Sequence, residues 1–286
     1  MNKILLILIV AVLTLSTLAC SFTVNVPTIE TGPDQTYTIQ EPDPEDKEPV
    51  DLSLQVGAAN IELSGGASGL VEGTVIYNLG DWEPKLTRAD HSLEIHQGKS
   101  GDVGGFNVND IKNEWDLKLS QSVPLDLSIE AGAYTGRMDL SGVPLRTLEI
   151  HDGASDNTIQ FNTLNPYKME SFEYLTGAST VRLEGLANAN PKELNFSGGA
   201  GTYTLDFTGE LQQDMNVKID AGVSTIRIII PANMNVEIDV IGEMKTVATQ
   251  GTWTVSDTRY TAGGEGPLLS VEINTSLGTL TLEHEK

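Results

Sequence analysis

The sequence SGGAGTYTLDF at residues 197–207 is one copy of a motif that recurs along the chain. When its second glycine is taken as position zero, six further copies align with it. From the second copy to the sixth, successive centres lie 21, 24, 22 and 23 residues apart, a period of about 22 residues. The residues at position zero are Gly57, Gly132, Gly153, Gly177, Gly199, Gly222 and Ser276.

Apolar residues recur at fixed distances from each motif centre. Positions −5 and −3 are apolar or aromatic in every copy, as in Leu194 and Phe196, and position +1 is a small or apolar residue, as in Ala200. Positions +4 and +6 are mostly apolar, as in Tyr203 and Leu205. Such alternation is typical of a β-strand with one buried face. Because the apolar positions change from odd to even, we expect a bulge or corner between +1 and +4.

The repeat predicts an all-β fold, either a β-solenoid or a stacked β-sheet repeat with a period of about 22 residues. A parallel β-α-β arrangement would need a helix of about ten or more residues in each repeat, and the sequence between the copies has no such amphipathic segment. A glycine at position zero indicates either a backbone with positive φ or a close approach to the next layer.

The first residues have the features of a secretory signal. Residues 1–19 carry a lysine at position 3, continue through the apolar run 4–13 and end in small residues before Cys20, the single cysteine of the chain. The sequence at 18–20 resembles the end of a bacterial lipoprotein signal, in which the cysteine receives lipid. An ordinary cleaved signal or an uncleaved anchor is the alternative. Two or three acyl chains would hold the protein on a membrane surface.

The rest of the chain divides into a spacer and a body. Residues 20–50 contain five prolines and an acidic run, so we expect an extended tether that lifts the body off the membrane. Residues 51–286 are long enough for one elongated repeat domain, or for two subdomains that meet near residue 120.

Several segments together resemble the toast-rack family of bacterial cell-envelope proteins. They are VGAA at 56–59, EGTVIYN at 72–78, NEWDL at 113–117, VPLDL at 123–127 and TSLGTL at 275–280. The resemblance covers roughly residues 51–282. It implies a stacked all-β fold and a connection with adhesin-like and envelope-stress proteins. The family brings no agreed catalytic residues.

The residue types that carry chemistry are scattered. The histidines His91, His96, His151 and His284 lack the spacing of a zinc site, and GGAG at 198–201 is followed by neither the lysine nor the helix of a phosphate loop. Asp152 and its polar neighbours, Ser155, Asp156 and Asn157, would suit either calcium or the capping of a corner. We therefore expect no catalytic residues, no metal and no cofactor.

One outward position carries a regular charge. Position +5 holds Arg137, Arg182 and Arg227, with threonines in the copies between them. These arginines form either a stripe that binds an anionic polymer or a set of cross-strand pairs with neighbouring carboxylates. The net charge of −23 disfavours nucleic acid as a partner.

Two hypotheses of function follow. The first is a non-enzymatic, surface-anchored lipoprotein of the bacterial cell envelope, adhesin-like or structural, which faces outside the cytoplasm. Its partners would be the membrane, through the lipid at Cys20, and an envelope glycan or another surface protein. The second is a carbohydrate-binding or carbohydrate-active β-helix, whose enzymatic form would need clustered carboxylates on one exposed ledge.

Overall fold

The structure is a computed structural model that describes residues 31–98, 111–242 and 246–284. The predicted signal at residues 1–19 and Cys20 lie outside the described residues. The described residues fall in one compact unit.

The described chain is almost entirely β-strand, which confirms the all-β prediction. Its strands form one 16-stranded sheet that does not close on itself, and its only helices are the short α2 (Leu186–Ala189) and η1 (Gly80–Trp82). The strands are β1 (Gln35–Glu41), β2 (Val50–Gly65), β3 (Val71–Tyr77), β4 (Lys85–Ala89), β5 (Ser92–His96), β6 (Asn113–Leu119), β7 (Leu125–Asp139), β8 (Leu145–Gln160), β9 (Met169–Glu184), β10 (Pro191–Asp206), β11 (Met215–Ile230), β12 (Asn235–Gly242), β13 (Thr246–Gln250), β14 (Thr254–Ser256), β15 (Arg259–Ala262) and β16 (Leu268–His284).

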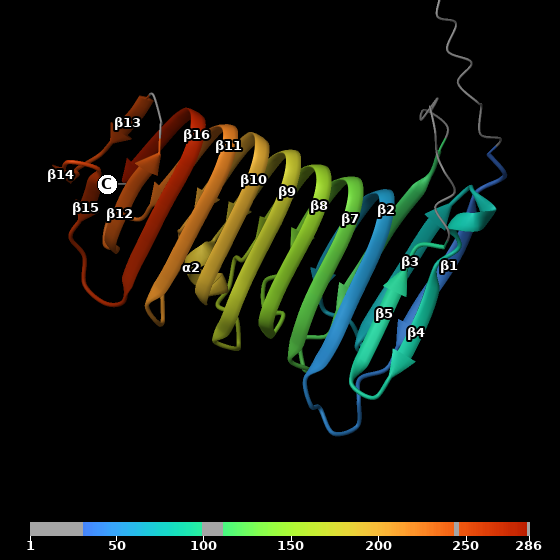
Figure 1. Ribbon diagram of the computed structural model, residues 1–286. Helices are drawn as coiled ribbons and strands as arrows, with labels where there is room; N and C mark the ends of the chain where they lie inside the picture. Colours follow the sequence, from blue (N-terminus) through green and yellow to red (C-terminus); the bar gives the residue numbers. More distant parts are fainter. Residues whose placement is uncertain (1–30, 99–110, 243–245, 285–286) are drawn as a thin grey trace, which may run out of the picture. The chain divides into compact units, whose positions relative to one another are not determined.

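The long strands lie parallel and side by side in the order β2, β7, β8, β9, β10, β11, β16 (Figure 1). Equivalent motif positions pair with one another: Leu127 pairs with Leu148, and Leu148 pairs with Phe172. The alignment of motif copies from sequence therefore agrees with the observed register. We call each long strand, or each pair of short strands in the same register, a rung.

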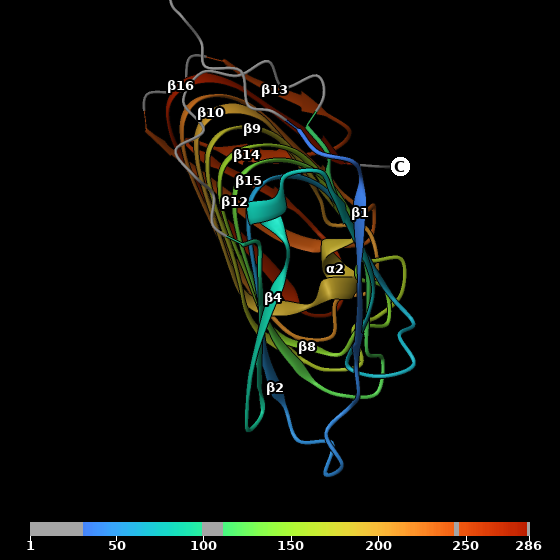
Figure 2. The same ribbon diagram turned by 90° about the vertical axis from the view of Figure 1, so that its right-hand side faces the viewer.

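Each long strand bends at its motif centre, so that its two halves form opposite walls around the core (Figure 2). Positions −5, −3 and −1 point inward before the bend, and positions +2, +4 and +6 point inward after it. The residues at position +1, such as Ala200, are exposed in every copy, so the prediction that this position faces inward is wrong. The parity changes because positions zero and +1 both point outward, as in a β-bulge.

The core between the walls is apolar and aromatic. Tyr174 in β9 packs against Phe196 in β10, with ring centroids 5.5 Å apart. Phe196 in turn meets Tyr203, from the second half of the same strand, edge to face at 4.8 Å. All three side chains are fully buried. Stacked rungs thus bury apolar surface that one rung alone would leave in water.

Two end rungs are split at the bend. β5 pairs with the first half of β2 and β6 pairs with its second half, so the two short strands together occupy the place of one long strand. Leu93 and Trp115 pair with β2 residues on either side of the bend. At the other end, β12 and β13 pair with the two halves of β16. Beyond these rungs the sheet continues in antiparallel strands, β3 and β1 on one side and β15 and β14 on the other.

The segment expected to be an unpacked tether contains a strand. β1 pairs with β3, and Ile39 in β1 is only 1% exposed. The expectation of an unpacked chain therefore fails for Gln35–Glu41, because alternating side chains there bury one face despite the flanking prolines. The sheet also passes residue 120 without a break, since β2 pairs with β6 on one side and β7 on the other.

Candidate binding site

A row of glycines follows the bend from rung to rung. A Cβ atom on Gly153, Gly177 or Gly199 would lie 2.7, 2.5 or 2.4 Å from the carbonyl oxygen of the glycine in the preceding rung. None of the six motif glycines has the positive φ that side chains avoid. Close approach of neighbouring backbones therefore requires glycine here, which is one of the two reasons expected from the sequence.

In the last copy of the motif, the close approach of neighbouring backbones occurs at a different position. Ser276 occupies position zero, and the tight approach moves to Gly278, whose φ is 150°. A Cβ atom on Gly278 would lie 1.7 Å from the carbonyl oxygen of Ser224. Position +2 already needs glycine in β10, where a Cβ atom on Gly201 would lie 2.0 Å from the carbonyl oxygen of Ser179. The glycine requirement thus extends over the bend and is not confined to position zero.

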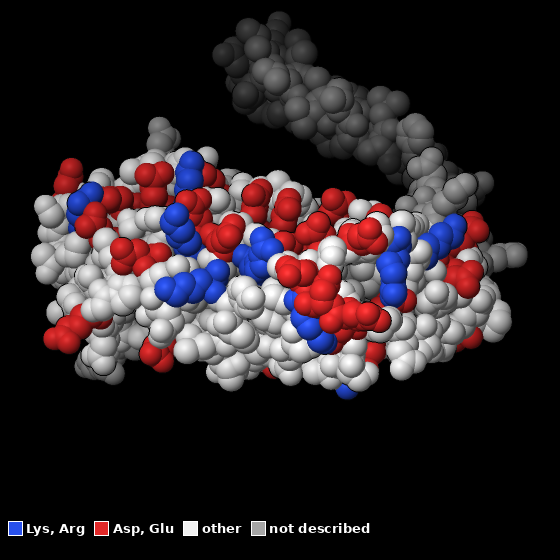
Figure 3. Space-filling view, turned by 90° about the horizontal axis from the view of Figure 1, so that it is seen from below, with Lys and Arg blue, Asp and Glu red and all other residues white. Residues whose placement is uncertain are grey.

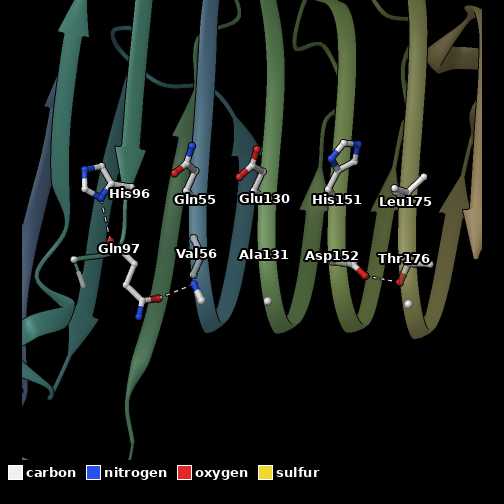
Figure 4. A pocket seen from close by; sticks show the side chains of 14 residues that line it. Gln55, Val56, His96, Gln97, Glu130, Ala131, His151, Asp152, Leu175 and Thr176 are labelled. Atoms are coloured by element: carbon white, nitrogen blue, oxygen red, sulfur yellow. Dashed lines mark hydrogen bonds between the residues drawn. The ribbon is translucent and has the colours of Figure 1, made fainter. Parts of the chain in front are cut away.

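The glycine row forms the floor of an open trough of about 800 Å³ on the outside of the bend. The trough crosses five strands, in the order β5, β2, β7, β8, β9. Its side is formed by the outward residues at position −2, which lie at one level in Figure 4. These residues, paired from strand to strand, are His96, Gln55, Glu130, His151 and Leu175.

The trough is polar and acidic. The ionisable residues in its lining are Glu130, Asp152 and two histidines, and none of the lining residues is lysine or arginine. The Nε2 atom of His151 lies 3.1 Å from Glu149 Oε1 and 3.6 Å from Oε1 of Glu173, the neighbouring glutamate on β9. This distribution of charge disfavours an anionic ligand.

Hydroxyl groups hold the carboxylate of Asp152 in the trough lining. Tyr174 donates a hydrogen bond of 2.9 Å and Ser155 one of 3.0 Å to Asp152 Oδ2. Thr176 donates to Oδ1 of the same carboxylate. These three hydroxyl groups therefore fix the orientation of the Asp152 carboxylate.

The network continues into the core through Asn157. Its Nδ2 atom donates to the hydroxyl oxygens of Tyr134 at 2.7 Å and Tyr174 at 3.0 Å. Burial raises the pKa of both tyrosines, and the nearby Asp152 charge raises them further, so both hydroxyls stay protonated. Gly136 leaves the space for Asn157, since a Cβ atom there would lie 2.3 Å from Asn157 Oδ1.

At the split end rung, the side-chain amide of Gln97 takes the place of the backbone that a continuous strand would provide. Gln97 Oε1 accepts a hydrogen bond of 3.0 Å from the backbone N–H of Gly57 and one of 2.9 Å from Asn113 Nδ2. Asn113 also donates 2.6 Å to the carbonyl oxygen of Ala58. These contacts close the end of the glycine row where residues 99–110 separate β5 from β6.

The predicted arginines do lie on one row of the opposite wall. Arg137 and Arg182 both pair with Thr158, and they line a second groove of about 570 Å³. Carboxylates share the lining of this groove: Glu62, Asp116, Asp139 and Asp156. Arg227 makes two hydrogen bonds to Glu283, of 2.8 and 2.5 Å. Cross-strand pairing thus accounts for Arg227.

Charges of both signs are interspersed on the surface seen in Figure 3. Basic side chains lie among more frequent acidic ones along its length, and uncharged residues cover much of the remainder. This face therefore presents no field of a single sign that would attract a polyanion.

The remaining sequence candidates lie apart from the trough. Within the described ranges, no three side chains of histidine, cysteine, aspartate or glutamate come together in a way that could hold a metal ion. His91 lies 3.4 Å from Asp46, and both ring nitrogens of His284 contact backbone carbonyls at 3.1 Å. No helix in the described part of the chain has the length and hydropathy needed to cross a membrane.

Sequence reasoning missed the row at position −2. Its residues differ in type from copy to copy, so no repeated residue marks this position in the sequence. One signal was present in the sequence. Because positions −3 and −1 both point inward, the residue between them must point outward, on the same side of the strand as the glycine at position zero.

A protein-family model described as the N-terminal domain of toast_rack, DUF2154, matches residues 30–170 and 170–229. No curated protein is significantly similar to the chain.

The chain is also similar to several solved structures of bacterial proteins. A candidate cell adhesion protein from Clostridium sporogenes is 19% identical, with a TM-score of 0.49, and the alignment covers 90% of this chain and 100% of that one. A candidate adhesin from Bacteroides fragilis is 10% identical, with a TM-score of 0.32 and coverage of 88% and 96%. A candidate lipid-binding protein from Parabacteroides distasonis is 15% identical, with a TM-score of 0.35 and coverage of 91% and 100%.

Proposed function

We propose that this chain, which belongs to the toast_rack family, is a non-enzymatic, adhesin-like module of the bacterial cell envelope. Its body is a β-solenoid with a period of about 22 residues, and it works by presenting a long surface to an envelope glycan or another surface protein. The membrane anchor is lipid on Cys20.

One observation carries the proposal: outward side chains repeat at the same position on one parallel strand after another. The trough at the bend crosses five strands and stays open along its length. Small-molecule and catalytic sites are usually concave pockets that bury most of the ligand. An open, repeated ledge is better suited to an extended or surface-bound partner.

Attachment to a membrane follows from the N-terminal sequence. Residues 1–19 and Cys20 have the order of a lipoprotein signal and its modified cysteine. A lipid-modified Cys20 would place the body outside the cytoplasm, with the following segment as a spacer. This arrangement lets the trough reach partners beyond the membrane surface.

The anchor and the adhesion are tested on the full chain produced in a bacterial host. Cys20→Ser should move the protein from the membrane fraction to the soluble fraction, and unchanged partitioning would contradict lipid attachment. Separately, beads that carry the full chain should be retained on immobilised cell-envelope fragments. Absence of retention would contradict an adhesin-like role, and depolymerisation of a captured glycan would contradict the non-enzymatic one.

A further inference from the structure

We propose that the trough binds a linear, uncharged, β-linked polysaccharide, which lies along the stack of rungs from β5 to β9. The proposal rests on the adhesin-like function above and names the class of ligand and the residues that recognise it. Gln55, Glu130, His151 and Leu175 are the side chains that would contact the sugar rings.

The spacing of the trough side chains favours a glycan over a peptide. Neighbouring strands lie about 4.8 Å apart, so position −2 presents one side chain per step of that length. An extended peptide places side chains on one face only every 6.7 Å or so, and it would fall out of step within a few strands. A β-linked pyranose chain advances by one ring in nearly the same step as the strands.

The backbone of the trough cannot add a peptide strand. β2, β7 and β8 are each paired with a parallel neighbour on both sides. Strand addition needs a free sheet edge with unpaired N–H and C=O groups. The ligand must therefore be recognised by the side chains and by the shape of the floor.

The side chains at position −2 have the chemistry that sugar hydroxyls need. The amide of Gln55, the carboxylate of Glu130 and the imidazole of His151 are planar groups that accept hydrogen bonds, and the amide and the imidazole donate them as well. Leu175 is 44% exposed at the β9 end of the trough and offers an apolar contact to the C–H face of a ring. Polar groups that fix orientation beside an apolar contact are typical of ligand sites.

The glycine floor and the acidic lining of the trough narrow the class of ligand further. Glycines at position zero leave a side-chain-free strip on which a ring can lie. At Gly132, Gly153 and Gly177 the carbonyl oxygen of the preceding rung leaves no room for a Cβ atom. Glu130 and Asp152 line the trough without lysine or arginine. Like-charge repulsion would oppose teichoic acids and uronic acid polymers, so an uncharged chain fits best.

The length of the trough sets the length of the ligand. Five strands span four steps, or about 19 Å. A chain of four to five rings would fill this distance, so affinity should rise with oligomer length up to that size and then level off.

The test is titration calorimetry of the full-length protein with cello-, chito-, xylo- and laminari-oligosaccharides from disaccharide to octasaccharide. We expect saturable binding to at least one series, with a plateau at the tetra- or pentasaccharide and little dependence on salt. Glu130→Ala with His151→Ala should weaken binding at least about tenfold, since two hydrogen-bonding groups are lost. Arg137→Ala with Arg182→Ala, on the opposite wall, is the matched control and should leave affinity unchanged.

The named outcomes separate this proposal from the adhesin-like function. No binding to any series, affinity independent of length, or an equal loss in the arginine control would overturn the glycan proposal. Retention on envelope fragments that persists in the Glu130→Ala, His151→Ala variant would also overturn it, while the adhesin-like function would stand. Preferential, salt-sensitive binding of a polyuronic acid would instead assign the ligand to a polyanion.

Discussion

The middle rungs and the end rungs handle the same bend in different ways. In β8, β9 and β10 the chain passes through the bend without interruption, because glycine lets neighbouring backbones approach closely. In the end rung, β5 and β6 are two separate strands, and the side-chain amide of Gln97 accepts a hydrogen bond from the backbone N–H of Gly57. A rung needs glycine only where an intact neighbour presses against it.

We expect the largest effect on stability from glycine-to-alanine substitution at the bend, compared between a middle rung and the strand next to a split end rung. Gly177→Ala would put a Cβ atom 2.5 Å from the carbonyl oxygen of Gly153, so we expect unfolding free energy to fall by roughly 3 kcal/mol or more. In Gly57→Ala the nearest atoms belong to the Gln97 side chain at 3.5 Å, an ordinary contact. That variant should change stability by less than about 1 kcal/mol.

Urea unfolding of the two variants measures both effects under the same conditions. Equal losses of stability would contradict the distinction between middle and end rungs. A Gly177→Ala variant that keeps wild-type stability would contradict the close approach itself.

A second prediction concerns the polar part of the middle rungs. Tyr174→Phe removes a donor to the Asp152 carboxylate and an acceptor for Asn157, so we expect a loss of about 1–3 kcal/mol. Tyr203→Phe is the matched control, because within the described residues the buried Tyr203 hydroxyl has no hydrogen-bond partner. Thermal unfolding should show the control unchanged or slightly stabilised, and a similar loss in both would refute the network as the cause.

The smallest expected effect is the acid sensitivity of the rung next to the far end. The hydrogen bond from Arg227 lowers the pKa of Glu283 below its ordinary 4.5, so the pair stabilises the fold above the pKa of the unfolded chain. This contribution is lost as pH falls through the lowered pKa of the folded state. Arg227 is half exposed, so we expect less than about 1 kcal/mol.

Glu283→Gln should remove that part of the pH dependence, as measured by unfolding midpoints between neutral and acidic pH. Arg182→Ala in the middle of the same row is the comparison, and its pH dependence should follow that of the wild type. A wild-type pH profile in Glu283→Gln would show that the pair does not contribute.

Much of the stack was predictable from apolar spacing. Leu127, Leu148 and Phe172 were aligned by distance from a glycine, and they pair in the structure. The inward placement of Ala200 was wrong because alternation alone does not locate a bulge, and small residues fit either face. The rung made of β5 and β6 was not aligned as a motif copy, because residues 99–110 stand between Leu93 and Trp115 in the sequence and neither half has a complete motif.

The candidate trough was less predictable than the fold. Its glycines were identified, and a close approach was one of the two expected reasons for them. Glu130 and His151 carry no repeated signal, because an outward position is free to vary in type. The stripe of Arg137, Arg182 and Arg227 was found as a pattern, although the carboxylates around it become visible only when the strands are paired.

The sequence by itself determined the all-β class, the copies and their mutual register, because burial of one face imposes a period that survives in the residues. Only the tertiary structure decided where the parity changes, which strands close the two ends, and which outward side chains share a trough. Those features depend on contacts between residues far apart in the chain, such as Gly57 with Gln97. The sequence around either residue does not indicate such a contact, because each residue type is also compatible with positions where no such contact forms.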